Sequence, residues 1–173
     1  MALLVDSVFL NGTVGSGKTT VASVIGALET IPHAVIDLDS IRQFGPKSDA
    51  DPFNHELELE NVASLAFNFR RAGAKRFVLA GVIEDSGEVD RYADALDSQR
   101  MALFRLTASP RVLDARLKWR HATDQVELDW HLSRVEQLTH ILNNAMIDEV
   151  LLDTSARTPH EVATMIRREI EWD

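Results

Sequence analysis

Apolar residues along the chain form either short continuous runs or longer stretches in which they recur every three or four positions. Continuous runs of this length, bounded by turn residues, indicate buried strands. We expect strands at residues 3–10, 33–39, 76–83, 101–108 and 149–153. The spaced stretches lie between these runs and after the last one, and they indicate amphipathic helices. Strands that alternate with helices favour an α/β fold, in which a five-stranded parallel sheet forms the middle of three layers.

Capping and helix-breaking residues predict where several helices begin and end. We expect Asp51 to cap a helix that has Pro52 in its first turn and ends at Gly73. Residues 158–161 read Thr-Pro-His-Glu, which is the pattern of a capping box with proline at the first helical position.

A glycine-rich segment joins the first predicted strand to the first predicted helix. Residues 12–19 read Gly-Thr-Val-Gly-Ser-Gly-Lys-Thr and fit the phosphate-loop pattern G-x-x-x-x-G-K-[ST] at each fixed position. Glycines allow such a loop to approach a phosphate closely, and the following helix directs its N–H groups at the anion. We expect Lys18 to reach the β- and γ-phosphates of ATP and Thr19 to ligate Mg²⁺. The residues predicted to bind the nucleotide are Gly12, Thr13, Val14, Gly15, Ser16, Gly17, Lys18, Thr19 and Thr20.

Two carboxylates end the second predicted strand. Asp37 and Asp39 are two positions apart, and would therefore share one side of an extended chain. The carboxyl ends of parallel strands face the ligand crevice, so both should lie near the phosphate loop. Asp39 is the candidate to orient an acceptor hydroxyl and take its proton. Asp37 or water would complete the Mg²⁺ shell, and Asp37 would also lie beside the acceptor. Glu84 and Asp85 are the runner-up acids, and the alternative for each carboxylate is a solvated charge or a helix cap.

Two further features of the second half of the chain bear on a substrate site. Gly81 lies near the end of the third predicted strand, whose apolar core does not end in an acidic residue. It would allow close approach of a substrate or mark a simple bulge. Arg116 and Arg120 are four positions apart and therefore share a helix face, and Arg134 follows in the next helix. We predict that residues 111–134 form a mobile lid whose arginines close over the phosphates. The alternative is that these arginines are solvated helix charges.

Length and composition narrow the class of protein. A chain of 173 residues without a linker-like segment is expected to form one domain over residues 1–173. A net charge of −9 argues against nucleic acid or an anionic membrane as partner. The chain has no cysteine, which excludes disulfides and thiolate metal sites. No segment resembles a signal peptide or a membrane span. The predicted nucleotide chemistry favours the cytoplasm, and a homodimer is compatible with the sequence.

These segments together resemble the P-loop small-molecule kinases, which are built like nucleoside monophosphate kinases, and among them the adenylylsulfate kinases. The resemblance is carried by residues 12–20, 37–42, 61–83 and 153–155. It implies that ATP and Mg²⁺ bind and that Asp39 and Arg42 face the phosphoryl acceptor. It also implies that Arg116, Arg120 and Arg134 belong to the lid and that Arg157 lies beside the adenine.

Two segments depart from the adenylylsulfate kinase pattern. Residues 48–53 and 82–86 replace segments that hold the sulfated nucleotide in that family. The acceptor therefore stays open among nucleosides, adenylylsulfate, sugars and hydroxylated antibiotics.

The function predicted from the sequence is ATP-dependent transfer of the γ-phosphate to a hydroxyl of a small molecule. Phosphoryl transfer needs mainly positioning and charge neutralisation, which Lys18, Arg116 and Arg120 are predicted to supply together with Asp39. The predicted acceptor site contains Asp37, Asp39, Arg42 and Gly81. The alternative is a P-loop NTP hydrolase or nucleotide-dependent switch. We expect such a protein to carry an acid or glutamine after the third strand, where this chain has Ala80 and Gly81.

Overall fold

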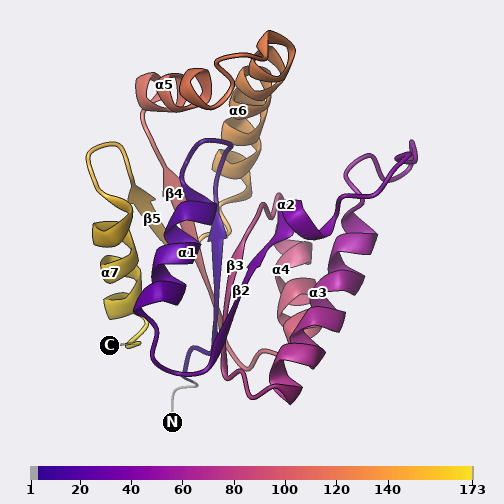
Figure 1. Ribbon diagram of the computed structural model, residues 1–173, viewed down its shortest axis with the longest axis vertical. Helices are drawn as coiled ribbons and strands as arrows, with labels where there is room; N and C mark the ends of the chain where they lie inside the picture. The colour runs from indigo at the N-terminus through magenta and orange to yellow at the C-terminus, as the bar shows by residue number, and fades with distance from the viewer. Residues whose placement is uncertain (1–3, 173) are drawn as a thin grey trace.

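A five-stranded sheet with every strand parallel lies between two layers of helices in the computed structural model, which describes residues 4–172 (Figure 1). The strands are β1 (Ser7–Asn11), β2 (His33–Asp37), β3 (Arg76–Ala80), β4 (Met101–Thr107) and β5 (Val150–Asp153). Their order across the sheet is β2-β3-β1-β4-β5. The predicted fold class and the number of strands are confirmed.

Both faces of the sheet are buried, which explains why its strands read as continuous apolar runs. Val8 and Leu10 of β1 pack in one core with α1 (Lys18–Leu28) and α7 (Pro159–Glu169). Phe9, between them, packs in the second core with α3 (His55–Arg71) and α4 (Ser86–Leu96). Figure 1 shows these two pairs of helices on opposite sides of the sheet.

The carboxyl end of the sheet is fixed by a buried asparagine. The Asn11 side chain accepts from the N–H groups of Gly12 at 2.9 Å and Ile83 at 3.2 Å. Its amide donates to the Ile83 carbonyl and to Asp148, each at 3.1 Å. The segments that leave β1 and β3 are therefore held together where a ligand crevice is expected. The sequence analysis did not single out Asn11.

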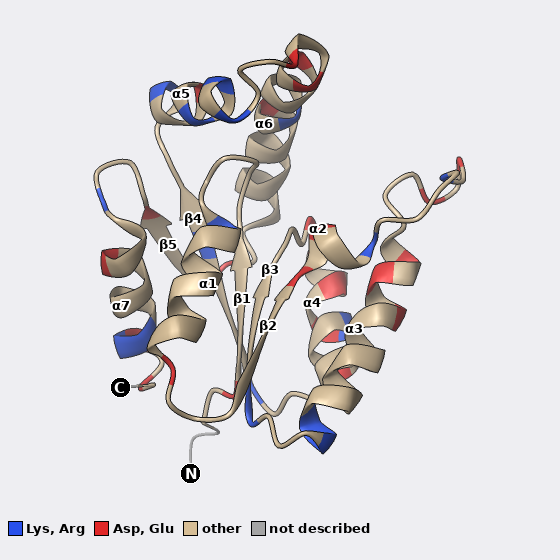
Figure 2. Ribbon diagram, in the orientation of Figure 1, with Lys and Arg blue, Asp and Glu red and all other residues tan. Residues whose placement is uncertain are grey.

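The remaining helices lie beyond this end of the sheet. The helices α5 (Pro110–Arg120) and α6 (Gln125–Ala145) form a hairpin that rises above the strands, and Figure 2 shows Lys and Arg on α5. The short helix α2 (Leu38–Ile41) and the connection to α3 lie at the same end. Within residues 4–172, no helix is long and apolar enough to cross a membrane.

Three predicted strand limits were wrong by two residues or more. β3 ends at Ala80, whereas the prediction continued to residue 83. Leu4 is 77% exposed and β1 begins at Ser7, while Leu3 lies outside the described residues. β2 ends at Asp37, which pairs with Ala80 at the last position of β3. The chain then turns into α2, so Asp39 lies in a helical turn and does not share the side of an extended strand with Asp37.

The start of α3 also differs from the prediction, because the chain makes a further turn before the helix. Asn54 adopts a left-handed conformation with φ of 54°, and the helix begins at His55. Asp51 still accepts from the N–H groups of His55 at 2.7 Å and Glu56 at 3.1 Å. Asp51 is thus a capping residue, while Pro52 lies outside the helix.

Candidate active site

The phosphate loop joins β1 to α1 and depends on glycine for its shape. Gly12 and Gly17 have φ of 140° and 100°, in the region that favours glycine. A Cβ on Gly12 would lie 2.4 Å from the Leu106 carbonyl oxygen. Gly17 is the N-cap of α1 and brings no side chain to the first N–H groups of that helix. These N–H groups are therefore suited to binding an anion.

Lys18 lies folded over this loop. Its ammonium donates to the carbonyl oxygens of Gly12 at 2.8 Å and Thr13 at 3.0 Å. Burial lowers the pKa of Lys18 to about 8, although the nearby carboxylates of Asp39 and Asp37 act to raise it. A bound phosphate would add negative charge beside the ammonium and favour its protonated form.

The two predicted metal ligands lie next to each other. The Thr19 hydroxyl donates to Asp37 Oδ2 at 2.7 Å. A hydroxyl and a carboxylate supply the hard oxygen donors that Mg²⁺ prefers, and both are beside the loop that would hold the phosphates. The donor set therefore fits Mg²⁺, and its binding stays a prediction.

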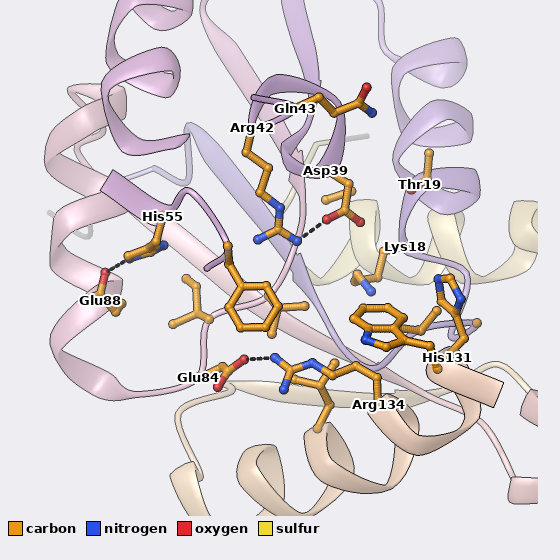
Figure 3. A pocket seen from close by; sticks show the side chains of 18 of the residues that line it. Lys18, Thr19, Asp39, Arg42, Gln43, His55, Glu84, Glu88, His131 and Arg134 are labelled. Carbon is orange, nitrogen blue, oxygen red and sulfur yellow. Dashed lines mark hydrogen bonds and ion pairs between the residues drawn. The ribbon is translucent and has the colours of Figure 1, made fainter. Parts of the chain in front are cut away.

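A cavity of about 870 Å³ opens in front of the loop. The predicted site residues that line it are Val14, Gly15, Gly17, Lys18, Thr19, Thr20, Asp39, Arg42, Glu84, Arg120 and Arg134. The predicted site residues that do not line it are Gly12, Thr13, Ser16, Asp37, Gly81, Arg116 and Arg157. The two predicted catalytic groups of opposite charge, Lys18 and Asp39, thus face the same space (Figure 3).

A chain of polar contacts leads from Asp39 into the core. Arg42 pairs with Asp39, and its Nη1 lies 3.2 Å from Glu58 Oε2. Glu58 is 1% exposed and accepts a hydrogen bond from the buried Tyr92 hydroxyl. Burial raises the pKa of Glu58, against the opposing effects of Tyr92 and Arg42. Since Glu58 Oε2 makes no hydrogen bond within residues 4–172, its contact with Arg42 is electrostatic.

Sequence reasoning missed Glu58 and its contact with Tyr92. The available signal was its position, because Glu58 precedes Val62 and Ala66 by four and eight residues and so lies on the buried face of α3. An acid on an apolar face indicates a buried charge with a partner. The partner could not be identified, since Tyr92 is 34 residues away.

The part of the cavity farther from the loop contains further pairs of polar side chains. His55 Nε2 lies 2.5 Å from Glu88 Oε2 (Figure 3). Arg134 Nη2 lies 2.5 Å from Glu84 Oε1, and its guanidinium lies 5.0 Å from the centre of the Phe53 ring. Three exposed aromatic side chains also line the cavity: Phe44, Phe53 and Trp130.

The arginines of the predicted lid have different surroundings. Arg120 lines the cavity and lies close enough to Lys18 to lower its pKa slightly further, after the larger effects of burial and the two aspartates. Arg116 donates to the Gly15 carbonyl and to the Thr154 hydroxyl and carbonyl, each at 3.0 Å. Arg116 therefore joins α5 to the phosphate loop and to the end of β5.

Two other predicted residues lie outside the cavity. A Cβ on Gly81 would lie 2.3 Å from Leu38 Cδ1, so glycine at this position is explained by packing of α2. Arg157 is exposed and donates to the Asp153 carbonyl at 2.6 Å, in the loop that precedes α7. Its predicted position beside an adenine stays a prediction.

The model of one protein family, described as AAA domain, matches residues 8–137. No curated protein matches the chain. Among solved structures, a tunicamycin resistance protein from Deinococcus radiodurans is similar with a TM-score of 0.66 and 21% identity, over 96% of this chain and 95% of that one. A gluconokinase from Sinorhizobium meliloti 1021 has a TM-score of 0.65 and 17% identity, over 98% of this chain and 94% of that one.

A third similar structure is a shikimate kinase from Acinetobacter baumannii in complex with shikimate. It has a TM-score of 0.61 and 15% identity, over 96% of this chain and 93% of that one. At these identities the similarity shows a shared fold, and the predicted P-loop fold is confirmed.

Proposed function

We propose that this chain, which belongs to the AAA domain family, is an ATP-dependent kinase that phosphorylates a hydroxyl of a small molecule. The observation that carries the proposal is the position of Asp39. Arg42 holds this carboxylate in the cavity that Lys18 also lines, beside the phosphate loop. Two of the similar structures are kinases by name, a gluconokinase and a shikimate kinase, which supports the same reaction.

In the proposed reaction, Asp39 orients the acceptor hydroxyl and takes its proton as the oxygen attacks the γ-phosphorus of ATP. The bond between the γ-phosphorus and the β-phosphate oxygen breaks, and ADP leaves. Lys18, Arg120 and the N–H groups of the loop stabilise negative charge on the transferring group. Mg²⁺, held by Thr19 and Asp37, would supply further charge neutralisation at the phosphates. Arg157 and the loop after β5 are the proposed neighbours of the adenine.

We also propose that the acceptor is uncharged and has a flat apolar face. We call the part of the cavity farther from the phosphate loop the acceptor half. Arg42, His55 and Arg134 line it, and each is paired with a carboxylate. Lys47, on the exposed connection between α2 and α3, is the exception. An anionic acceptor such as adenylylsulfate would need cations that are available to it. The aromatic rings favour a molecule that stacks, such as a nucleoside or a hydroxylated antibiotic.

The alternative of an NTP hydrolase has weaker support. Gly81 packs against Leu38, and the next acid along the chain, Glu84, is paired with Arg134. Within residues 80–84 the structure therefore offers no unpaired acid to orient an attacking water.

Screening for ADP release tests the proposal. Purified protein is incubated with ATP, Mg²⁺ and single compounds from a panel of uncharged nucleosides and hydroxylated antibiotics, with adenylylsulfate and sugar acids as the anionic comparison. We expect release that depends on an uncharged acceptor, with the phosphorylated product detected by mass spectrometry. Lys18→Ala is the control and should lose most of the release.

Two results would contradict the proposal in different ways. ADP release that no acceptor increases would identify a hydrolase. Absence of any thermal shift with ATP, ADP or GTP and Mg²⁺ would remove nucleotide binding itself, since a ligand at 100 Kd stabilises the folded state by about 2.7 kcal/mol.

A further inference from the structure

Three potential metal ligands meet at the corner between α5 and α6. His121 follows the last residue of α5, while Glu127 and His131 lie in the first two turns of α6. One ligand atom from each side chain lies within 4.8 Å of the other two. The cluster is outside the proposed catalytic machinery, although His131 also lines the cavity.

His121 has an unsatisfied buried nitrogen. Its Nε2 is inaccessible to solvent and makes no hydrogen bond within residues 4–172. The His121 ring stacks on that of His131, with centroids 4.3 Å apart and planes at 23°. A buried polar atom without a partner is costly, so this nitrogen calls for a ligand that the chain itself does not provide.

The hydrogen bond that His131 makes through one ring nitrogen leaves its other ring nitrogen available to a metal. Its Nδ1 lies 2.7 Å from the Glu127 carbonyl oxygen, which can only accept, so Nδ1 carries the proton. The Nε2 lone pair of the neutral ring is then available to a metal. A hydrogen bond from the other ring nitrogen to a carbonyl is the usual way in which a ligating histidine is oriented.

We propose that His121, Glu127 and His131 bind a transition-metal ion of the Zn²⁺ type. Two imidazoles and one carboxylate form a ligand set that suits Zn²⁺, whereas Mg²⁺ prefers oxygen ligands alone. Zn–N and Zn–O bonds of about 2.0–2.2 Å require ligand atoms about 3.4 Å apart, so side-chain rotations would contract the present cluster. Three protein ligands leave one coordination position open to water or to a ligand in the cavity.

Occupation of this site would fix the corner of the hairpin. The metal would connect the end of α5, which carries Arg120, to the first turns of α6. The ion would therefore restrict the movement of α5 relative to α6. This inference does not rest on the proposed kinase activity.

Cobalt binding tests the site, because Co²⁺ replaces Zn²⁺ and absorbs visible light. The full chain, treated with EDTA and dialysed, is titrated with Co²⁺ in the absence of nucleotide. We expect one equivalent to bind, with visible bands typical of a four- or five-coordinate ion, and Zn²⁺ to displace it. His121→Asn and Glu127→Gln should each weaken binding at least about 10–100-fold, the loss that even an outer-shell partner can cause.

Matched variants separate this site from other ways of binding cobalt. His160→Asn removes an exposed histidine on α7 and should leave the affinity unchanged. Asp37→Asn should also leave it unchanged, because that residue belongs to the predicted Mg²⁺ site. No visible bands, or bands that persist with equal affinity in both His121→Asn and Glu127→Gln, would overturn the proposal. An equal loss in His160→Asn would show nonspecific binding by surface histidines and would overturn it as well.

Discussion

Lys18 should make nucleotide binding sensitive to pH. Its pKa of about 8 is below the ordinary value for lysine, because burial disfavours the charged form. Above pH 8 Lys18 loses its charge in the free protein, so phosphate binding must be accompanied by uptake of a proton by Lys18. We therefore expect the affinity for Mg²⁺–ADP to fall by about tenfold per pH unit above pH 8. Isothermal titration in buffers of different ionisation enthalpy should show proton uptake near pH 8.5, and a flat profile would contradict this assignment.

The control for that measurement is Lys18→Ala. This variant should bind more weakly at pH 7 and show no proton uptake between pH 7 and 9.5.

The lowered pKa of Lys18 also affects folding stability. The unfolded chain binds more protons than the folded chain between pH 8 and the ordinary lysine value, so the contribution of Lys18 to the free energy of unfolding rises with pH in that window.

Glu58 positions Arg42, and through it Asp39, so its charge should affect turnover as well as stability. Glu58→Gln keeps an oxygen to accept from Tyr92 but removes the charge that faces Arg42. We expect a loss of about 1–3 kcal/mol in the free energy of unfolding. The turnover number should fall about 10- to 100-fold with the KM for ATP unchanged, because a displaced Asp39 affects transfer and not nucleotide binding. Denaturant unfolding and steady-state kinetics measure the two effects.

Glu60→Gln is the matched control, since Glu60 lies on α3 with its side chain exposed. It should alter neither stability nor turnover. If Glu58→Gln loses stability but keeps the wild-type turnover number, the buried pair is structural and Arg42 does not need it for positioning.

Lys18 and Thr19 owe their positions to local structure. Lys18 and Thr19 follow a loop whose glycines determine its path, so their placement beside Asp37 and Asp39 needed only the order of strands. Glu58 depends on partners that α2 and α4 bring to it, and no local pattern contains that information.

At the level of elements, the hairpin of α5 and α6 is the part of the protein that we expect to move. It rises beyond the sheet, and Trp119 near the end of α5 is 85% exposed. Closure would bring Arg120 and Arg134 toward bound phosphates and exclude water from the transfer. Hydrogen exchange in residues 111–134 should slow when ADP, Mg²⁺ and an acceptor bind. α7, which packs in the core with α1, serves as the internal reference.

Equal exchange in the hairpin with and without ligand would show a static helical pair. Arg120 would then be a cavity charge held in one place, and the prediction of a lid would be wrong. The Arg116 side chain should stay in place in either case, because its three hydrogen bonds already join α5 to the phosphate loop and to the residue after β5.

The boundaries of helices and strands were predicted correctly where local contacts set them, and wrongly where contacts with distant segments set them. The capping box at Thr158 is confirmed, because its two hydrogen bonds join residues three positions apart. The predicted end of β2 was wrong, because β2 ends at Asp37, its last residue that pairs with β3. The start of α3 was wrong, because Asn54 also donates to the carbonyls of Arg42 and Phe44, and this contact fixes a turn before the helix.

For the molecule as a whole, the sequence analysis singled out more of the cavity residues around the phosphate loop than of those that line the rest of the cavity. The phosphate loop is one continuous segment, whereas the acceptor half combines the connection before α3 with α4, α6 and the segment after β3. Its aromatic rings and charge pairs join residues up to 50 positions apart. The proposal for the chemical class of the acceptor therefore depends on how these elements pack together.

Asp39→Asn tests whether the two halves act as one kinase site. The substitution removes the proton acceptor and leaves the phosphate loop intact, so we expect nucleotide affinity close to that of the wild type. Phosphate transfer to an acceptor found in the screen should fall about 10²–10⁴-fold, the usual loss for a general base. The turnover number and kcat/KM should fall together, since the lost interaction acts in the transition state.

Two comparisons give this experiment its meaning. Asp49→Asn changes an exposed acid in the connection before α3 and should transfer phosphate at the wild-type rate. Slow hydrolysis of ATP without acceptor should change far less in Asp39→Asn than transfer does, because water does not depend on the acceptor position. If Asp39→Asn transfers phosphate at the wild-type rate, Asp39 serves only to pair with Arg42, and Glu84 or Asp37 becomes the candidate base. Equal losses of transfer and hydrolysis would instead mean that Asp39 acts on the nucleotide, through its charge beside Lys18.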